Sequence, residues 1–277
     1  MKSVLYNSTI LKKREGEMRK TISIIALIVV LIAMVSCASA GGAAKKADDD
    51  PAIHVTTMEE LAEAVKADNA IVIVDNDIAW NPMYVNGAQL EIRTGENAVI
   101  DFNGHQITEL KHAALRIFGD FTIKNGTFIG EGNSYGLLIN SNNTTSGVDY
   151  NPETRENHRV IVENMKLVEC GIRAELSTID IINCDIQNSG DSGNGNTVYF
   201  VGVFGTVSGG KLSQTGEAQE TISRTNCVYA SGNSTVSIIG VALEGTKRVN
   251  AYKNVVSYTV KDCPDAVTTT PDYVTFL

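Results

Sequence analysis

The sequence predicts an all-β domain in which short strands recur along the chain. Of its 277 residues, 43% are hydrophobic and 5 are proline, so the chain can fill a core and is not a disordered polymer. Within residues 99–265, short segments carry apolar residues at every second position, which is typical of strands with one buried face. Each segment has Asn, Gly or Asp at the same place, which indicates a recurrent sharp bend.

The N-terminal segment has the features of a targeting signal. Met18-Arg19-Lys20 is basic, and Ile22 to Val35 is an uninterrupted run of apolar or small residues. The run is shorter than the roughly 20 residues that span a bilayer, and it has the length of a signal-peptide core. Residues 1–17 are polar and precede a suitable start at Met18, so we exclude them from the fold.

The apolar run ends in Met34-Val35-Ser36-Cys37. This motif resembles the lipobox of bacterial lipoproteins, with Met34 in place of the usual Leu. The resemblance implies that Cys37 is lipidated after cleavage and anchors the protein to a membrane, so that it lies in the cell envelope. Ala38-Ser39-Ala40 fits the small-x-small rule for ordinary secretion. A secreted, soluble protein is therefore the alternative.

We expect three parts: an N-terminal extension with the signal (1–37), a flexible tether (38–52) and one folded domain (53–277). Residues 51–277 carry 15 Lys or Arg against 27 Asp or Glu. Nucleic-acid binding needs a basic face, so this acidic part of the chain argues against it. We expect a monomer.

The domain is expected to begin with a helix and a strand. Thr57-Met58-Glu59-Glu60 fits a capping box, and Met58, Leu61 and Val65 follow at helical spacing. Residues 70–74 then have the composition of a strand. A helix placed before the first strand layer would cover the exposed end of a stack of strands.

Seven segments share one pattern: 99–107, 121–128, 160–167, 179–186, 205–212, 236–243 and 258–265. Each begins as a strand and then reaches a residue that tolerates the left-handed conformation. In order, these residues are Asn103, Asn125, Asn164, Asn183, Gly209, Gly240 and Asp262. The shortest spacings between them, 19 and 22 residues, set the repeat, and longer spacings indicate inserted loops such as Asn140–Arg159.

A second strand column follows at 114–117, 136–139, 171–174, 197–200, 227–230 and 250–253. Its second and fourth positions are apolar except for Lys253, so they are predicted to face a core. The third position is predicted to face solvent and is occupied by Arg116, Leu138, Arg173, Tyr199, Tyr229 and Tyr252.

Together, the bend column and phrases such as IDFNGH and TIKNGTF resemble the right-handed parallel β-helix of the pectate-lyase-like superfamily. The resemblance covers roughly residues 71–265. It implies a single-stranded right-handed parallel β-helix of about seven or eight coils, with the N-terminal helix as a cap. Residues 272–277 are expected to seal the other end. Cys170, Cys184, Cys227 and Cys263 show no metal-binding spacing, and we expect buried single thiols.

In this superfamily, sugar polymers usually bind along the outer face of one parallel sheet. The resemblance therefore makes the outward positions Arg116, Arg173, Tyr199, Tyr229 and Tyr252 candidate ligand-binding residues. Tyrosine rings can lie against sugar rings while their hydroxyl groups form hydrogen bonds. The alternative is that stacked residues of this column only stabilise neighbouring coils.

A catalytic role needs more acidic groups than this column supplies. A lyase of this superfamily needs several carboxylates to hold Ca²⁺, together with a basic residue that removes a proton. The outward positions offer only Glu175 with Arg173 and Arg116, and a hydrolase would need a cluster of Asp residues. We therefore expect no metal site and no cofactor, with Ca²⁺ required only if the protein is a lyase.

The leading hypothesis is an exported lipoprotein that binds a glycan or a surface partner without catalysis. Two alternatives stay open. The protein is a polysaccharide lyase or glycoside hydrolase, with Arg173, Glu175 and Arg116 as its catalytic residues. Otherwise it is a structural spacer without a ligand.

Overall fold

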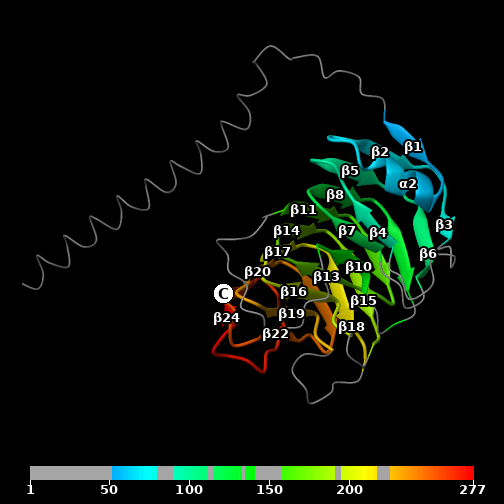
Figure 1. Ribbon diagram of the computed structural model, residues 1–277. Helices are drawn as coiled ribbons and strands as arrows, with labels where there is room; N and C mark the ends of the chain where they lie inside the picture. Colours follow the sequence, from blue (N-terminus) through cyan, green and yellow to red (C-terminus); the bar gives the residue numbers. More distant parts are fainter. Residues whose placement is uncertain are drawn as a thin grey trace, which may run out of the picture. The chain divides into compact units, whose positions relative to one another are not determined.

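The computed structural model describes residues 52–79, 90–110, 115–130, 132, 135–140, 158–190, 195–216 and 225–277. The described chain forms three parallel sheets and one short helix, as the all-β prediction requires (Figure 1). The predicted signal (1–37), with Cys37, and all but the last residue of the predicted tether (38–52) lie outside the described residues.

The largest sheet has ten strands. In spatial order they are β1 (Ile53–Val55), β2 (Ile71–Val74), β5 (Ala98–Asp101), β8 (Phe121–Lys124), β11 (His158–Glu163), β14 (Ser177–Ile182), β17 (Phe204–Ser208), β20 (Thr235–Ile239), β23 (Ser257–Lys261) and β24 (Thr275–Phe276).

The other two sheets have seven strands each. One, the β3–β21 sheet, contains β3 (Ile78–Ala79), β6 (Gln106–Leu110), β9 (Thr127–Gly130), β12 (Lys166–Val168), β15 (Asp185–Asn188), β18 (Lys211–Gln214) and β21 (Ala242–Gly245). The other, the β4–β22 sheet, contains β4 (Leu90–Arg93), β7 (Leu115–Phe118), β10 (Tyr135–Ile139), β13 (Gly171–Glu175), β16 (Val198–Val201), β19 (Val228–Ser231) and β22 (Val249–Ala251).

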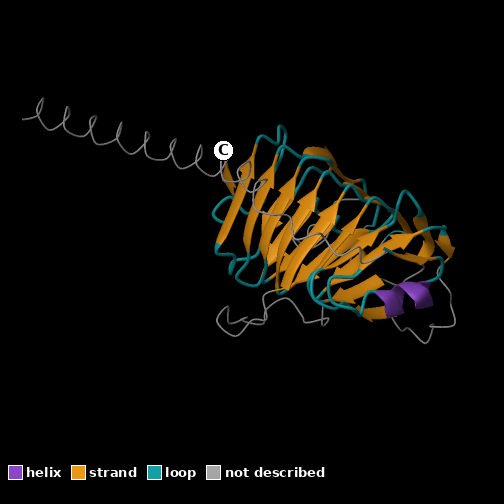
Figure 2. Ribbon diagram, turned by 90° about the horizontal axis from the view of Figure 1, so that it is seen from above, coloured by secondary structure: helices purple, strands orange, loops and turns teal. Residues whose placement is uncertain are grey.

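From β2 to β22, the chain visits the three sheets in a fixed order. Each round adds one strand to the ten-stranded sheet, one to the β3–β21 sheet and one to the β4–β22 sheet, so every strand pairs with strands three places away along the chain. Figure 2 shows the resulting ladders of parallel strands with the helix at one end. The predicted repeat is therefore one round of three strands.

The predicted bends lie where a strand of the ten-stranded sheet ends. All seven have positive φ: Asn103 (51°), Asn125 (57°), Asn164 (52°), Asn183 (53°), Gly209 (61°), Gly240 (61°) and Asp262 (54°). After the first six, the chain enters the β3–β21 sheet. Asp262 follows β23, and no described strand of the β3–β21 sheet comes after it.

The predicted N-terminal helix is present as α2 (Met58–Ala64). Thr57 caps it: the Thr57 hydroxyl accepts from the Glu60 N–H at 3.2 Å, and the Glu60 carboxylate accepts from the Thr57 N–H at 3.2 Å. Met58 and Leu61 are buried in the main core, and α2 packs against β1 and β2. The helix therefore covers apolar side chains at the β1–β2 end of the stack.

The main core lies between the sheets and is filled by inward residues of every round. In the β4–β22 sheet it includes Leu115, Leu137, Ile172, Val198 and Val228, which are predicted inward positions. For the last strand the predicted register is wrong by two residues. Tyr229 pairs with Asn250 and Ala230 with Ala251, so Asn250 rather than Tyr252 occupies the third position. Strand alternation has a period of two and cannot detect a shift of two residues.

Candidate functional site

The outer face of the β4–β22 sheet holds most of the candidate residues. Its central row follows the register through Glu91, Arg116, Leu138, Arg173, Tyr199, Tyr229 and Asn250. Two residues further along each strand, a second row includes Arg93, Phe118 and Glu175. The sequence placed Arg116, Arg173, Tyr199 and Tyr229 correctly on one row. It misplaced Tyr252, which lies beyond the end of β22 with 40% of its surface exposed.

The tyrosines of this face are buried, contrary to the prediction that the third position faces solvent. Tyr199 is 8% exposed and Tyr229 is 2% exposed. Their ring centroids lie 5.3 Å apart, and the Tyr135 ring lies 6.3 Å from that of Tyr199. With Leu138 and Val201 these rings form a second apolar cluster outside the main core, which we call the tyrosine cluster. Alternation shows which sheet face a residue occupies but not what covers that face.

Burial also changes the chemistry of the tyrosine cluster. Removal from water raises the pKa of the Tyr229 phenol well above its ordinary range, and burial does the same for Tyr135. The Tyr199 hydroxyl lies 3.3 Å from the Ser231 hydroxyl. The rings therefore contact each other and the sheet, and they are not free to stack on a sugar.

Arg173 and Glu175 form an ion pair beside the tyrosine cluster. Nε and Nη2 of Arg173 lie 2.8 Å and 2.7 Å from Oε1 of Glu175, whose side chain has no exposed surface. The Arg173 guanidinium also lies 5.1 Å from the centre of the Tyr199 ring. Both groups that would serve as catalytic residues in a lyase or hydrolase are therefore bound to each other.

The β4–β7 end of the same face is more open. Arg93 is exposed, and its guanidinium lies 4.8 Å from the centre of the half-buried Phe118 ring. The guanidinium of Arg116, which is half-buried, lies 5.9 Å from the same ring. We call these three residues the arginine–phenylalanine cluster. It places two positive charges and one aromatic ring together.

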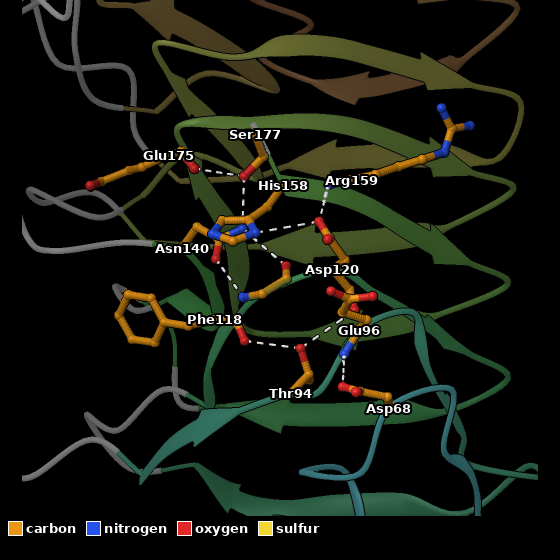
Figure 3. A network of polar contacts seen from close by, with 11 residues as sticks. Asp68, Thr94, Glu96, Phe118, Asp120, Asn140, His158, Arg159, Glu175 and Ser177 are labelled. Atoms are coloured by element: carbon orange, nitrogen blue, oxygen red, sulfur yellow. Dashed lines mark hydrogen bonds and ion pairs between the residues drawn. The ribbon is translucent and has the colours of Figure 1, made fainter. Parts of the chain in front are cut away.

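A polar corner connects the β4–β22 sheet to the ten-stranded sheet (Figure 3). Asn140, which is 4% exposed and has a φ of 48°, accepts from the Gly119 N–H at 2.9 Å and donates to the Ser177 hydroxyl at 3.0 Å. Ser177 in turn donates to the Glu175 carbonyl at 2.7 Å. In Figure 3 the Glu175 carboxylate points away from this corner. Asn140 and Ser177 thus fix the backbone that carries Glu175.

Within the described residues, no group of three or more His, Cys, Asp or Glu side chains is placed to hold a metal ion. Cys170, Cys184 and Cys227 are buried free thiols, and Cys263 is a half-buried free thiol. Burial raises the pKa of Cys170 and Cys227 to about 12 and that of Cys184 to about 11. Their arrangement fits the prediction of single thiols.

The comparisons with known proteins add no family. No family model, curated protein or solved structure matches the chain. In the described part of the chain, no helix has the length and apolar character needed to cross a membrane.

Sequence reasoning missed Arg93 and Phe118. Both had a signal: Leu90-Glu91-Ile92-Arg93 has the same alternation as the strand column, and Phe118 follows Arg116 by two residues and therefore shares its face. Extending the column by one strand and by two positions would have found the arginine–phenylalanine cluster.

Proposed function

We propose that this protein is an exported envelope lipoprotein whose domain binds a glycan without catalysing its breakdown. In this proposal the three parallel sheets are those of a right-handed parallel β-helix of the pectate-lyase-like type. Cys37 carries the lipid that attaches the protein to the membrane. The domain then presents the outer face of the β4–β22 sheet to its ligand.

The arginine–phenylalanine cluster is the observation that carries this proposal. An exposed Arg93, a half-buried Phe118 and a half-buried Arg116 combine an apolar ring with several N–H donors. Sugar recognition uses this combination, because a ring contacts the C–H face of a sugar and donors bind its oxygens. The tyrosine cluster lies on the same outer face and is not itself proposed to touch the ligand.

Binding without catalysis is favoured by the ion pair of Arg173 with Glu175. A general base must reach its proton, and a guanidinium held by a buried carboxylate is poorly placed for that task. The same contact makes Glu175 a poor general acid, because its Oε1 already accepts a hydrogen bond from Nε of Arg173 and forms an ion pair with Nη2.

The test uses the full-length protein on a panel of immobilised polysaccharides. We expect at least one polysaccharide to bind, and we expect Phe118→Ala to weaken that binding while the chain stays folded. Tyr252→Ala is the matched control, because this exposed tyrosine lies off the proposed face. Unsaturated products or new reducing ends after incubation would overturn the non-catalytic assignment, and absence of any binding would favour a structural spacer.

The anchor is tested separately. Mass spectrometry of the protein expressed in a bacterial host should find the mature N-terminus at a lipid-modified Cys37. Cys37→Ser should release the protein from the membrane fraction. A mature chain beginning after Ala40 would instead indicate ordinary secretion.

A further inference from the structure

Arg116 differs from Arg173 in what its guanidinium contacts. Leu138 of β10 pairs with Arg116 on one side and with Arg173 on the other, so the two arginines occupy equivalent positions two strands apart. Arg173 directs Nε and Nη2 at the carboxylate of Glu175. The same two atoms of Arg116 are buried and have no hydrogen-bond partner.

An unpartnered guanidinium edge is costly. A buried N–H group that has lost water and gained no acceptor destabilises the folded state, and this cost is larger when the group is charged. The Phe118 ring attracts the Arg116 cation but cannot accept its in-plane N–H bonds. Glu175, whose side chain is described, is already held by Arg173. Glu91 of β4 pairs with Arg116 in the sheet register, and its side chain lies outside the described part of the structure. Nothing described therefore supplies the acceptors that this edge lacks.

An oxyanion would complete the site. The Nε–Nη2 edge of arginine donates two parallel hydrogen bonds, which match two oxygens of a carboxylate or sulfate group. We propose that Arg116 binds such an oxyanion on the ligand with the same Nε–Nη2 edge that Arg173 directs at Oε1 of Glu175. Arg93, on the other side of Phe118, adds a second positive charge to the site.

This inference rests on the proposed function, because the oxyanion is taken to belong to the glycan. It restricts the class of glycan to those that carry carboxylate or sulfate groups. Because Nε and Nη2 are closed to solvent, binding requires a small movement of the side chain toward the open side of the face.

The first experiment needs no glycan. Thermal unfolding of the full-length protein is measured in millimolar sodium sulfate and in sodium chloride of equal ionic strength. We expect sulfate to raise the melting temperature of the wild type by about 2–4 °C, since a ligand of the folded state stabilises it. Arg116→Gln should lose this difference. Arg159→Gln, which removes an exposed arginine of the ten-stranded sheet, should retain it.

Arg116→Leu provides a second variant, because the next strand already has Leu138 in this row. We expect its melting temperature in chloride to exceed that of the wild type, since the uncompensated charge is gone, and to be insensitive to sulfate. An equal sulfate response in the wild type and both Arg116 variants would overturn the inference.

The second experiment identifies the source of the oxyanion. Binding is compared for hyaluronan, which carries carboxylates, dextran sulfate, which carries sulfates, and neutral dextran. We expect one of the acidic polymers to bind and Arg116→Gln to weaken it about tenfold or more. Equal binding of neutral dextran would overturn this inference but not the proposed function. A sulfate response that depends on Arg116, without binding of any polymer, would overturn the proposed glycan binding but not the oxyanion site at Arg116.

Discussion

The two ends of the outer face of the β4–β22 sheet differ in environment. At the β4–β7 end, Arg93 is exposed and Arg116 and Phe118 are half-buried. At the β16–β19 end, Tyr199 and Tyr229 are buried in the tyrosine cluster. Equivalent positions on one sheet face thus act as surface at one end and as a second core at the other.

This difference shows that the row cannot be treated as one continuous binding stripe. The tyrosines contact each other and Arg173, whereas the arginine–phenylalanine cluster is the part of this face that we propose for ligand binding. Variants at the two ends should therefore separate stability from binding.

The largest expected effect is the loss of a ring from the tyrosine cluster. Tyr229→Ala removes an aromatic ring that is 2% exposed, and should lower the free energy of unfolding by about 4 kcal/mol. Phe118→Ala removes a half-buried ring at the other end and should cost about 1–2 kcal/mol. Urea unfolding followed by circular dichroism measures both. Equal losses would mean that the two ends do not differ as described.

The ion pair between the two ends should give the next largest effect. Glu175→Gln leaves the Arg173 guanidinium beside a neutral side chain, and should destabilise the fold by about 3 kcal/mol because the carboxylate is fully buried. Asp180→Asn is the matched control, since it breaks an exposed ion pair with Arg159 at 3.5 Å and should cost less than about 1 kcal/mol. A loss at Glu175 no larger than this control would contradict the assignment.

The repeat and its bends were predictable because they depend on local chemistry. Residues that tolerate positive φ stand where each strand of the ten-stranded sheet ends, and all seven predicted positions adopt it. The capping box at Thr57 was equally local. These features follow from the conformational preferences of single residues and from strand alternation.

The state of the outer face was not predictable by the same means. Tyr199 and Tyr229 occupy the outward positions of their strands, where alternation predicts exposure to solvent, yet long-range contacts bury them. The two-residue error in the predicted register at Asn250 also involves long-range contacts. The buried amide oxygen of Asn250 accepts hydrogen bonds from the Thr268 hydroxyl and the Thr269 N–H, both at 2.9 Å. Such contacts join residues distant along the chain, so a strand pattern does not contain them.

Alkaline pH gives a smaller effect that is confined to the buried end. Burial raises the pKa of the Tyr229 phenol above its ordinary value of 10.0. Above pH 10 the unfolded chain loses this proton while the folded chain keeps it, so stability is complete below pH 10 and falls as the pH rises. The contribution lost by pH 11 is about 1.4 kcal/mol.

Tyr229→Phe removes the titrating hydroxyl and keeps the ring. The wild type should therefore lose about 1.4 kcal/mol more than this variant between pH 9 and pH 11 in urea unfolding. Comparing the two chains cancels the contribution of the buried thiols, which both retain. Parallel pH profiles would show that Tyr229 is hydrated in solution and that the two ends are alike.

The smallest effect concerns the bends, which are common to both ends of the stack. Asn103, Asn125 and Asn164 serve the earlier rounds, while Gly209 and Gly240 serve later ones. At Gly240 φ is 61° and an added Cβ would meet no atom within 4 Å, so only backbone strain opposes a side chain there. Gly240→Ala should therefore cost about 1 kcal/mol, and Gly240→Asn less, because Asn tolerates this conformation.

Urea unfolding of the two variants tests whether the same conformational rule determines the bends along the whole stack. An Asn variant as unstable as the Ala variant would show that the later bends need glycine for another reason, as at Gly209, where an added Cβ would lie 2.3 Å from the Asn183 side chain.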